Sequence, residues 1–340
     1  MIDLLTTPEE QEIADTVSRM LAENYPVNRF RIPAQERPAT DANIVAHLAK
    51  LGAPGLGVSE AAGGLGLGCA IEALVFREYG RFLASPRVLG TILAARMAAT
   101  SGATASVAEF IAGEVTAGVG IAAKMGNRGT LLGEVQIFDA GPRHQFVLWE
   151  ERGAGLYDAT GLDRRPVKGL DETLTMEIAE TKGLEPLIWI EASTEPLPLL
   201  GDLFSAAMMV GMCEAVRDMA VEYAKTREQF GQPIGHFQAV KHKCADMALH
   251  VEAAWCETVY AALELEQSAP SAQFHVLNSK LLAARALLNA AKDNIQVHGG
   301  MGYTTEVSAH HFMKRGRVMS EIGGGPRKLQ ARLLALPIAS

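Results

Sequence analysis

The 340-residue sequence is poor in cysteine and in aromatic residues. Its four cysteines, Cys69, Cys213, Cys244 and Cys256, form no CxxC pair, which argues against a cysteine-based zinc site or a disulfide framework. A reducing cytoplasm is therefore the expected location. Aromatic residues make up only 6% of the chain whereas glycine contributes 33 residues, a composition that favours closely packed helices.

The sequence also lacks an excess of positive charge and a long apolar run. Lysine and arginine total 31 against 39 acidic residues, so the net charge of −8 gives no reason to expect a nucleic-acid partner. The acidic, amphipathic start has neither the basic nor the apolar region of a secretion signal. No uninterrupted apolar stretch reaches the roughly 18 residues that a bilayer-spanning helix needs, so we expect no membrane partner.

The first of three regions with different patterns is helical. Thr7 can cap a helix that begins at Pro8, and Ile13, Val17 and Leu21 follow at helical spacing. Breaker-rich sequence then separates further helices, which are predicted over 41–52, 69–83 and 86–101.

The pattern changes near residue 116 and again near residue 198. Short runs rich in Val, Ile, Leu and Trp, separated by turn residues, predict strands up to about residue 196. Three long segments then predict a bundle of long antiparallel helices, over 202–226, 238–267 and 271–297. We therefore predict a mainly helical α+β fold with a helical N-terminal domain, a small reduced β domain and a long C-terminal four-helix bundle, over 1–115, 116–197 and 198–340.

The segment 227–238 lies between two of the long helices and combines a cation, a ring and amide side chains. One interpretation is a helix end followed by a turn at Gly231 and Pro233. The other is a site for an anion and an aromatic ring, in which the Arg227 guanidinium binds a phosphate and Phe230 faces a base.

The segment 296–303 ends another long helix with a pair of glycines. Gly299 and Gly300 can simply stop the helix. Alternatively, glycines leave backbone N–H groups bare, so that a pyrophosphate can approach them. Gln296 just upstream, and the position of this segment one long-helix interval after Arg227, favour a binding site.

Together these segments, RxQFGxPIxxFQ and QxHGGxGYxxE, resemble the acyl-CoA dehydrogenase family of flavoproteins. The N-terminal stretch LGAPGLGVSEAAGGLGLG and the following FREYGR are similar to the same family. The resemblance covers nearly the whole chain, is strong in the first and last thirds and is poor in the middle.

The resemblance implies a subunit that pairs, with pairs forming tetramers and FAD lying between the β domain of one subunit and the helical domain of its mate. The reaction it implies is α,β-dehydrogenation of an acyl-CoA thioester, in which a carboxylate takes the α proton and the flavin takes the β hydride. An electron-transfer flavoprotein is the expected electron acceptor.

The resemblance also implies which residues contact FAD. Arg227 would contact the pyrophosphate across the dimer interface, and Phe230 would lie against the adenine beside Gln229. The remaining contacts would come from Ile234, Phe237 and Gln238, which continue that wall, and from Gln296, Gly299 and Gly300 near the pyrophosphate and ribose.

The middle region departs from the family. Members carry a loop of the type TEPxxGSD that contacts flavin or substrate, and a Trp-containing strand that covers the flavin ring. No such loop is present here, and Trp149 and Trp189 are interpreted as core aromatic residues of strands. The sequence therefore does not show the flavin half-site that a subunit's own β domain makes.

The catalytic carboxylate is also missing. Aligned with the family, Gly324 stands where the usual glutamate lies, and Gly201 stands at the alternative position used in some branches. The neighbouring Asp202 is either the N-cap of the long helix that begins near Leu203 or a base displaced by one residue. Glu321, one turn before Gly324, is a further candidate.

Two adjacent histidines lie close to several cations near the end of the chain. No metal-binding pattern is present, and we predict no metal site. His310 and His311 adjoin Lys314, Arg315 and Arg317 and are interpreted as a solvated cationic helix face, with contacts to CoA phosphates as the alternative.

Three functional hypotheses follow. The chain is a shortened subunit of a hetero-oligomer, in which a second acyl-CoA dehydrogenase chain supplies the base and a complete β domain. Alternatively, it is a self-sufficient homo-oligomer with Asp202 or another acid as base. The third hypothesis is a non-catalytic binding protein built on the same fold.

Overall fold

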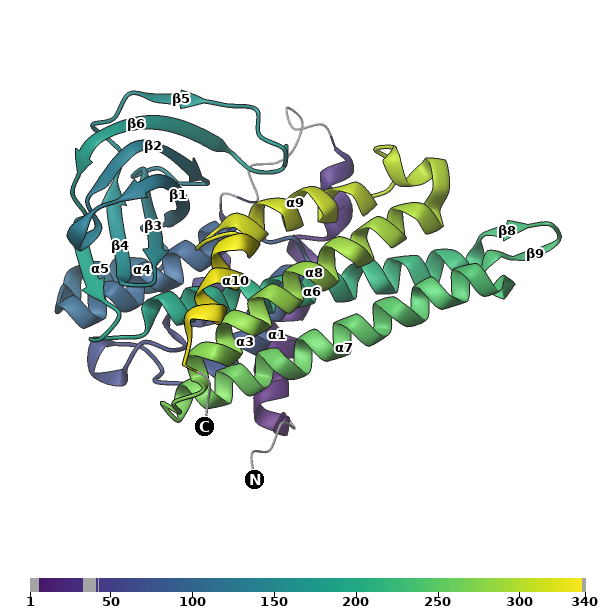
Figure 1. The fold of residues 1–340 in the computed structure, drawn as a ribbon, viewed down its shortest axis with the longest axis horizontal. Helices are drawn as coiled ribbons and strands as arrows, with labels where there is room; N and C mark the ends of the chain where they lie inside the picture. The colour runs from purple at the N-terminus through teal and green to yellow at the C-terminus, as the bar shows by residue number, and fades with distance from the viewer. Residues whose placement is uncertain (1–5, 33–40, 42, 338–340) are drawn as a thin grey trace.

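A computed structural model describes residues 6–32, 41 and 43–337 of the chain. The N-terminal part is helical (Figure 1). Its α-helices are α1 (Pro8–Asn24), α2 (Ile44–Ala49), α3 (Cys69–Arg81), α4 (Arg87–Ser101) and α5 (Thr104–Ile111). The expectation of no secretion signal rests partly on residues 1–5, and the helix expected over 41–52 includes residue 42; these residues lie outside the described ones.

Helix α1 begins where the sequence predicts. The Thr7 hydroxyl accepts a hydrogen bond from the Glu10 backbone N–H, and the Glu10 carboxylate accepts one from the Thr7 N–H, which completes a capping box. Helix α2 is shorter than predicted and is followed by Gly52 with a φ of 75°, a conformation that glycine adopts readily.

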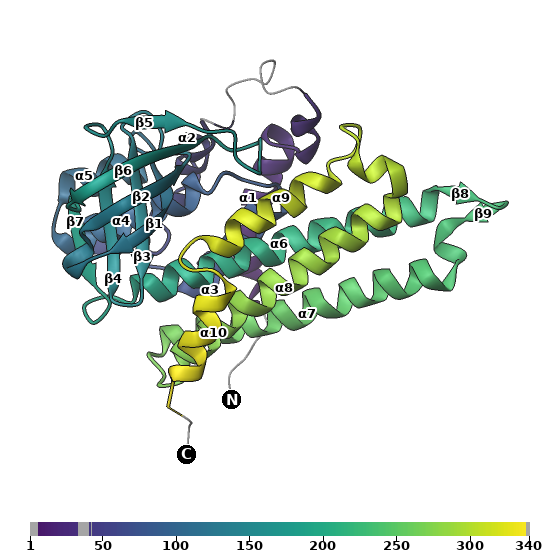
Figure 2. The ribbon, with the colours of Figure 1, turned by 45° about the horizontal axis from the view of Figure 1, so that its top comes forward.

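The middle of the chain forms one twisted sheet of seven strands beside α4 and α5 (Figures 1 and 2). Its strand order is β5-β6-β2-β1-β3-β4-β7. Neighbouring strands are antiparallel except for β1 and β3, which pair in parallel only from Ala117 to Val119. The strands are β1 (Ala117–Met125), β2 (Leu131–Phe138), β3 (Gln145–Glu150), β4 (Gly153–Asp158), β5 (Arg164–Pro166), β6 (Met176–Leu184) and β7 (Ile188–Glu191).

Two strands were not expected from the sequence. Strand β4 contains glycine and alanine at three of its first four positions, and strand β5 is only 3 residues long. Neither strand has the β-branched composition that is typical of strands. Both form because neighbouring strands of the sheet pair with them.

The last part of the chain is again helical. Its α-helices are α6 (Leu197–Thr226), α7 (Gln238–Glu266), α8 (Ala272–His298), α9 (Ala309–Glu321) and α10 (Pro326–Ala335). Figure 2 shows α6, α7 and α8 running side by side away from the sheet. The fold prediction is confirmed in its order: helices, a sheet, then a bundle of long helices.

Helix α6 is the centre of the molecule and begins earlier than predicted. Its first residue is Leu197, so Asp202 lies in the second turn and the N-cap interpretation of Asp202 is wrong. By length and composition α6 could cross a membrane, but 89% of its most apolar window is buried inside the protein. The helix is therefore a core helix.

Helices α3 and α6 cross at two glycines. A Cβ atom on Gly80 would overlap the backbone oxygen of Met208, and one on Gly211 would overlap the backbone oxygen of Arg77. The two backbones can approach this closely only because neither glycine carries a side chain. This crossing joins the N-terminal helices to the bundle.

Substitution of Gly211 by alanine tests the crossing. Although alanine favours a helix, the added methyl group has no space, so we expect Gly211→Ala to lower the free energy of unfolding by about 1–3 kcal/mol. Urea unfolding measures the change. The control is Gly300→Ala, because an added Cβ there has no atom within 4 Å. Equal stability of the two variants would contradict the predicted crossing.

Candidate functional site

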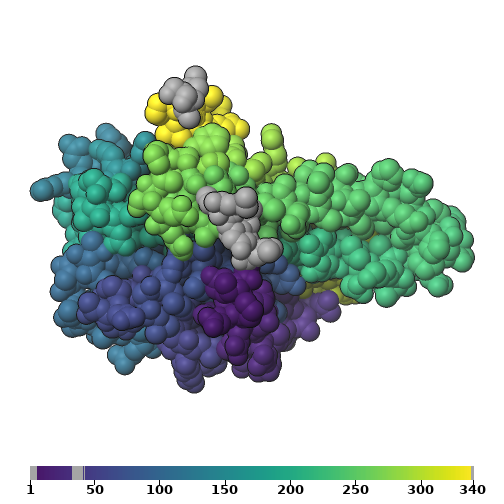
Figure 3. Space-filling model, turned by 90° about the horizontal axis from the view of Figure 1, so that it is seen from below, coloured from purple at the N-terminus to yellow at the C-terminus, as the bar shows by residue number. Residues whose placement is uncertain are grey.

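The segment after α6 forms a hairpin at the end of the bundle. Strands β8 (Glu228–Gln229) and β9 (Gln232–Pro233) pair across a turn, in which Phe230 and Gly231 have φ values of 54° and 77°. Two positive φ values are typical of a tight hairpin turn. The hairpin projects from the body of the protein (Figures 1 and 3).

The hairpin exposes the predicted binding residues. The Phe230 side chain is 92% exposed at the tip and meets Phe237 edge-on, with ring centroids 6.0 Å apart. Arg227 is exposed directly after α6, and within the described part of the chain its guanidinium makes no hydrogen bond or ion pair. Gln229 and Gln238 are also exposed, and Ile234 is half-buried.

The end of α8 lies beside the same hairpin. Tyr223 in the last turn of α6 stacks on His298, the last residue of α8, with centroids 4.2 Å apart. Gln296, Gly299 and Gly300 are exposed there, and a Cβ on either glycine would have nothing within 4 Å. The structure therefore brings both predicted segments together at one accessible end of the bundle.

A cleft of about 610 Å³ lies at the opposite end, between the sheet and the last helices. Strands β1 and β3 separate beyond Val119, and residues 120–122 and 148–151 line one wall. Residues 323–328 line the other, with Glu321 and Arg332 at its edges. Gly324, one of the two positions at which the resemblance implies a carboxylate, lines this cleft.

Trp149 lies between Gly201 and Gly323, the residue before Gly324. Its side chain is 1% exposed, which agrees with its interpretation as a core residue. A Cβ on Gly201 would lie 2.6 Å from the indole Cε2, and one on Gly323 would overlap the indole nitrogen. Gly324 has a φ of 109°, which residues with side chains rarely adopt.

Asp202 lies behind this tryptophan and is fully buried. Its Oδ1 accepts hydrogen bonds from Trp149 Nε1 at 3.0 Å and from Lys280 Nζ at 2.7 Å. Its Oδ2 accepts one from Arg332 at 3.2 Å. A base must reach the substrate proton, and a carboxylate enclosed by three donors is better suited to a structural role. The base interpretation therefore stays a prediction with no support from this geometry.

Lys280 and Arg332 were not singled out from the sequence. Lys280 is fully buried, although charged side chains are almost never buried without a partner. Its ammonium also donates to the Ile322 backbone oxygen at 2.6 Å. The only signal was a lysine within the apolar pattern of α8, and that pattern does not identify its partner.

His310 and His311 do not form a solvated face, so that interpretation is wrong. His311 and Arg315 are buried, and Arg315 pairs with buried Asp171.

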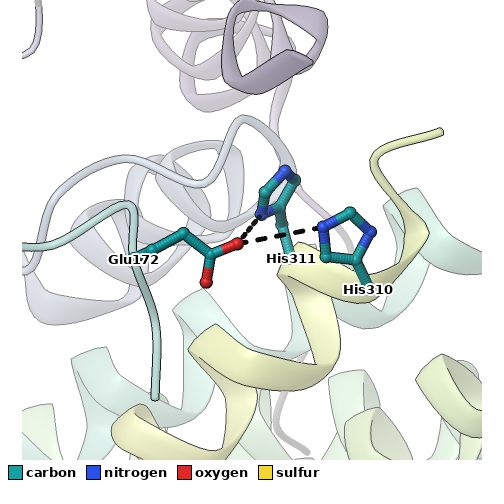
Figure 4. A group of neighbouring side chains, drawn as sticks. All are labelled: Glu172, His310 and His311. Carbon is teal, nitrogen blue, oxygen red and sulfur yellow. Dashed lines mark ion pairs between the residues drawn. The ribbon is translucent and has the colours of Figure 1, made fainter. Parts of the chain in front are cut away.

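The atoms of Glu172, His310 and His311 that could bind a metal lie within 4.8 Å of one another (Figure 4). Lys314 Nζ already donates to both Glu172 oxygens, at 2.7 and 2.8 Å. We therefore interpret the cluster as an ion-paired junction, because the ammonium would repel a metal ion.

The buried histidine makes stability sensitive to acid. Burial, together with the neighbouring His310, lowers the pKa of His311 from 6.5 to about 4. Below pH 6.5 the unfolded chain binds a proton that the folded chain does not, so stability falls as pH drops towards 4.

His311→Gln should therefore flatten the dependence of the unfolding free energy on pH across this window. Each unit of pKa shift corresponds to about 1.4 kcal/mol, so the acid loss shrinks by up to about 3 kcal/mol. Urea unfolding between pH 7 and pH 4 measures it. The exposed His250→Gln serves as control, and parallel curves for both variants would refute the assignment.

Comparison with known proteins decides the family. Residues 7–118 match the acyl-CoA dehydrogenase N-terminal domain and residues 203–337 match the acyl-CoA dehydrogenase C-terminal domain. The chain belongs to the acyl-CoA dehydrogenase family. The predicted family is thereby confirmed, and members of this family bind FAD.

Individual relatives extend over the whole chain. Acyl-CoA dehydrogenase IpdE2 of Mycobacterium tuberculosis is 29% identical over 336 residues, covering 97% of this chain and 98% of that protein. A chain of the ChsE4–ChsE5 complex from the same organism is 22% identical, with a TM-score of 0.81 over 99% of this chain and 100% of that chain. PigA with FAD and proline is 19% identical, with a TM-score of 0.77 over 98% of both chains.

Proposed function

We propose that this chain is one subunit of a hetero-oligomeric acyl-CoA dehydrogenase and that it holds the flavin of its partner through the hairpin end of the bundle. The observation that carries the proposal is the contrast between the two ends. The predicted FAD-contacting residues lie at one end, where most of them are exposed. At the other end glycine stands at both base positions, and one of these, Gly324, lines the cleft.

The exposed end fits a dinucleotide. Arg227 offers a planar set of donors that matches a pyrophosphate and has no competing carboxylate among the described residues. Phe230 presents a ring face for an adenine, with Gln229, Ile234, Phe237 and Gln238 beside it. Gly299 and Gly300 leave room for the backbone to approach phosphate or ribose. When bound, FAD accepts a hydride from the acyl chain.

The base must then come from another chain. Removal of the α proton of an acyl-CoA needs a carboxylate within reach, and neither Gly201 nor Gly324 provides one. The ChsE4–ChsE5 structure supports the proposal, because a relative with the same fold is found in a complex of two different chains.

We further propose an acyl-CoA substrate, a dimer or tetramer, and an electron-transfer flavoprotein as electron acceptor. We also propose a cytoplasmic location, because a reducing compartment suits the four free cysteines.

Two alternatives lead to different observations. In a self-sufficient enzyme, Glu321 is better placed than Asp202, because Glu321 lines the cleft and Asp202 is buried. In a non-catalytic binding protein, the exposed Arg227 and Phe230 would have no cofactor to contact. The first alternative gives a chain that is active alone, and the second gives one that never binds flavin.

The visible spectrum of the purified chain tests the proposal. We would record it for the chain alone and for the chain co-expressed with a second acyl-CoA dehydrogenase chain, then add a panel of acyl-CoA thioesters without oxygen. The expected result is a flavin band that thioester bleaches only in the co-expressed complex. Bleaching in the chain alone would overturn the proposal, and a colourless complex would favour the binding protein.

Arg227→Met tests the contact that the hairpin makes. Loss of a charge-assisted hydrogen bond costs about 1.5–3 kcal/mol, so FAD should bind the complex about 10- to 100-fold more weakly. Equilibrium dialysis of the complex with FAD measures the dissociation constant. The control is Lys225→Met, which removes an exposed cation that pairs with Glu222 on the same helix. Equal effects of the two substitutions would argue against the assigned contact.

A further inference from the structure

We propose that Tyr223 and His298 are positioning residues, whose stacked rings hold the two FAD-contacting segments at a fixed separation. The proposal rests on the proposed function for the ligand, FAD, that both segments contact. It goes further because it assigns the placement of the two segments to one contact between α6 and α8. Neither residue is among those assigned to contact FAD.

The two segments begin at the ends of different helices. Arg227 directly follows α6, whereas Gly299 and Gly300 directly follow α8. One dinucleotide can contact both segments only when they lie at the right separation. Binding is weaker when the ligand must first order groups that move independently, because the ordering costs free energy. A contact that fixes the two helix ends beforehand therefore strengthens binding without touching the ligand.

Tyr223 is tied to the hairpin segment through the backbone. It lies in the last turn of α6, and its backbone oxygen accepts a hydrogen bond from the Arg227 N–H at 2.8 Å. The Arg227 backbone oxygen accepts one from the Ile234 N–H, also at 2.8 Å. The backbone of Arg227 is therefore fixed relative to the residue that carries the stacked ring.

His298 is tied in the same way to the glycine segment. It is the last residue of α8, and its side chain is 5% exposed. Its Nδ1 lies 2.9 Å from the Asn294 backbone oxygen, which can only accept, so this nitrogen carries the proton. Burial lowers the pKa of His298 from its usual 6.5, so the ring is neutral at pH 7. Because Gly299 follows directly, the placement of the ring sets where the backbone leaves the helix.

The ring stack joins the two helix ends. Its centroids lie 4.2 Å apart and its planes are 24° from parallel, so the rings meet largely face to face. One helical turn further from the hairpin, Asn294 Nδ2 donates to Met219 Sδ at 3.4 Å, and a thioether sulfur is a weak acceptor. The ion pair between Lys243 and Asp293 connects α8 to α7 rather than to α6. The stack is therefore the contact best placed to hold the ends of α6 and α8 together.

Equilibrium dialysis of the co-expressed complex with FAD tests the proposal. Tyr223→Ala and His298→Ala should each raise the dissociation constant roughly 3- to 10-fold, the range expected for loss of an aromatic pair. Because both changes remove the same contact, the double variant should bind no more weakly than the weaker single variant. Tyr223→Phe keeps the ring and should bind as the unsubstituted complex does. Additive losses, or an unchanged dissociation constant in either alanine variant, would overturn the proposal.

His275→Ala is the matched control. His275 also lies on α8 and contacts a tyrosine of a neighbouring helix, since its ring centroid is 4.6 Å from that of Tyr260 on α7. It lies near the other end of α8, about 35 Å from the glycine segment. The change removes the same kind of contact and should leave FAD binding unchanged. Equal weakening in this variant would indicate a general loosening of the bundle and would count against the proposal.

A distance measurement without FAD tests the same contact independently. Spin labels are attached at Glu228→Cys and Gly300→Cys, two exposed positions, after Cys244 and Cys256 have been replaced by serine. Pulsed electron spin resonance then reports the distribution of distances between the labels. Tyr223→Ala should broaden this distribution, whereas Tyr223→Phe should not. The same distribution in the alanine variant and the unsubstituted chain would overturn the proposal.

The outcomes separate this proposal from the proposed function. If the unsubstituted complex does not bind FAD, the proposed function fails, and the label distances still decide whether the stack fixes the two segments. If the alanine variants are not recovered folded, Tyr223→Leu and His298→Leu take their place in both measurements, because leucine keeps apolar volume without a ring.

Discussion

The buried pair between Asp202 and Lys280 is the interaction on which the arrangement of the cleft depends. Both side chains are fully buried, and Arg332 and Trp149 complete the coordination of the carboxylate. Removing one partner of such a pair costs about 3–5 kcal/mol, because the other charge is left without compensation. Four elements, β3, α6, α8 and α10, meet at this point, so the pair links the sheet to the helical bundle.

The two ends of the bundle differ in what they leave accessible. Near the sheet, α6 is surrounded on all sides and its carboxylate is internal. At the far end, Arg227 and Phe230 face solvent, and the Phe230 ring at the tip of the hairpin meets Phe237 edge-on. The accessible end therefore offers an uncovered cation and an uncovered ring, whereas the end near the sheet keeps its charges internal.

Much of this architecture could be predicted from the sequence because its signals are local. Thr7 and Pro8 mark a helix start, and Gly299 directly follows the last residue of α8. The burial of His311 and Arg315 could not be predicted, because a polar side chain shows its partner only after distant segments pack together. Asp171 lies far away in sequence, and so does the partner of Lys280. Strand β4 was missed for a similar reason, since a glycine-rich segment becomes a strand only when its neighbours pair with it.

The length of helix α6 also links the position of the hairpin to the packing near the sheet. Its 30 residues extend over about 45 Å, so a tilt of one degree at its base displaces the hairpin by about 0.8 Å. The ion pair at Asp202 holds the first turns of α6, and the glycine crossing with α3 holds its middle. The rigid packing of α6 near the sheet thus limits how far the hairpin at its other end can move. Substitutions near the sheet can therefore move the hairpin although they lie far from it.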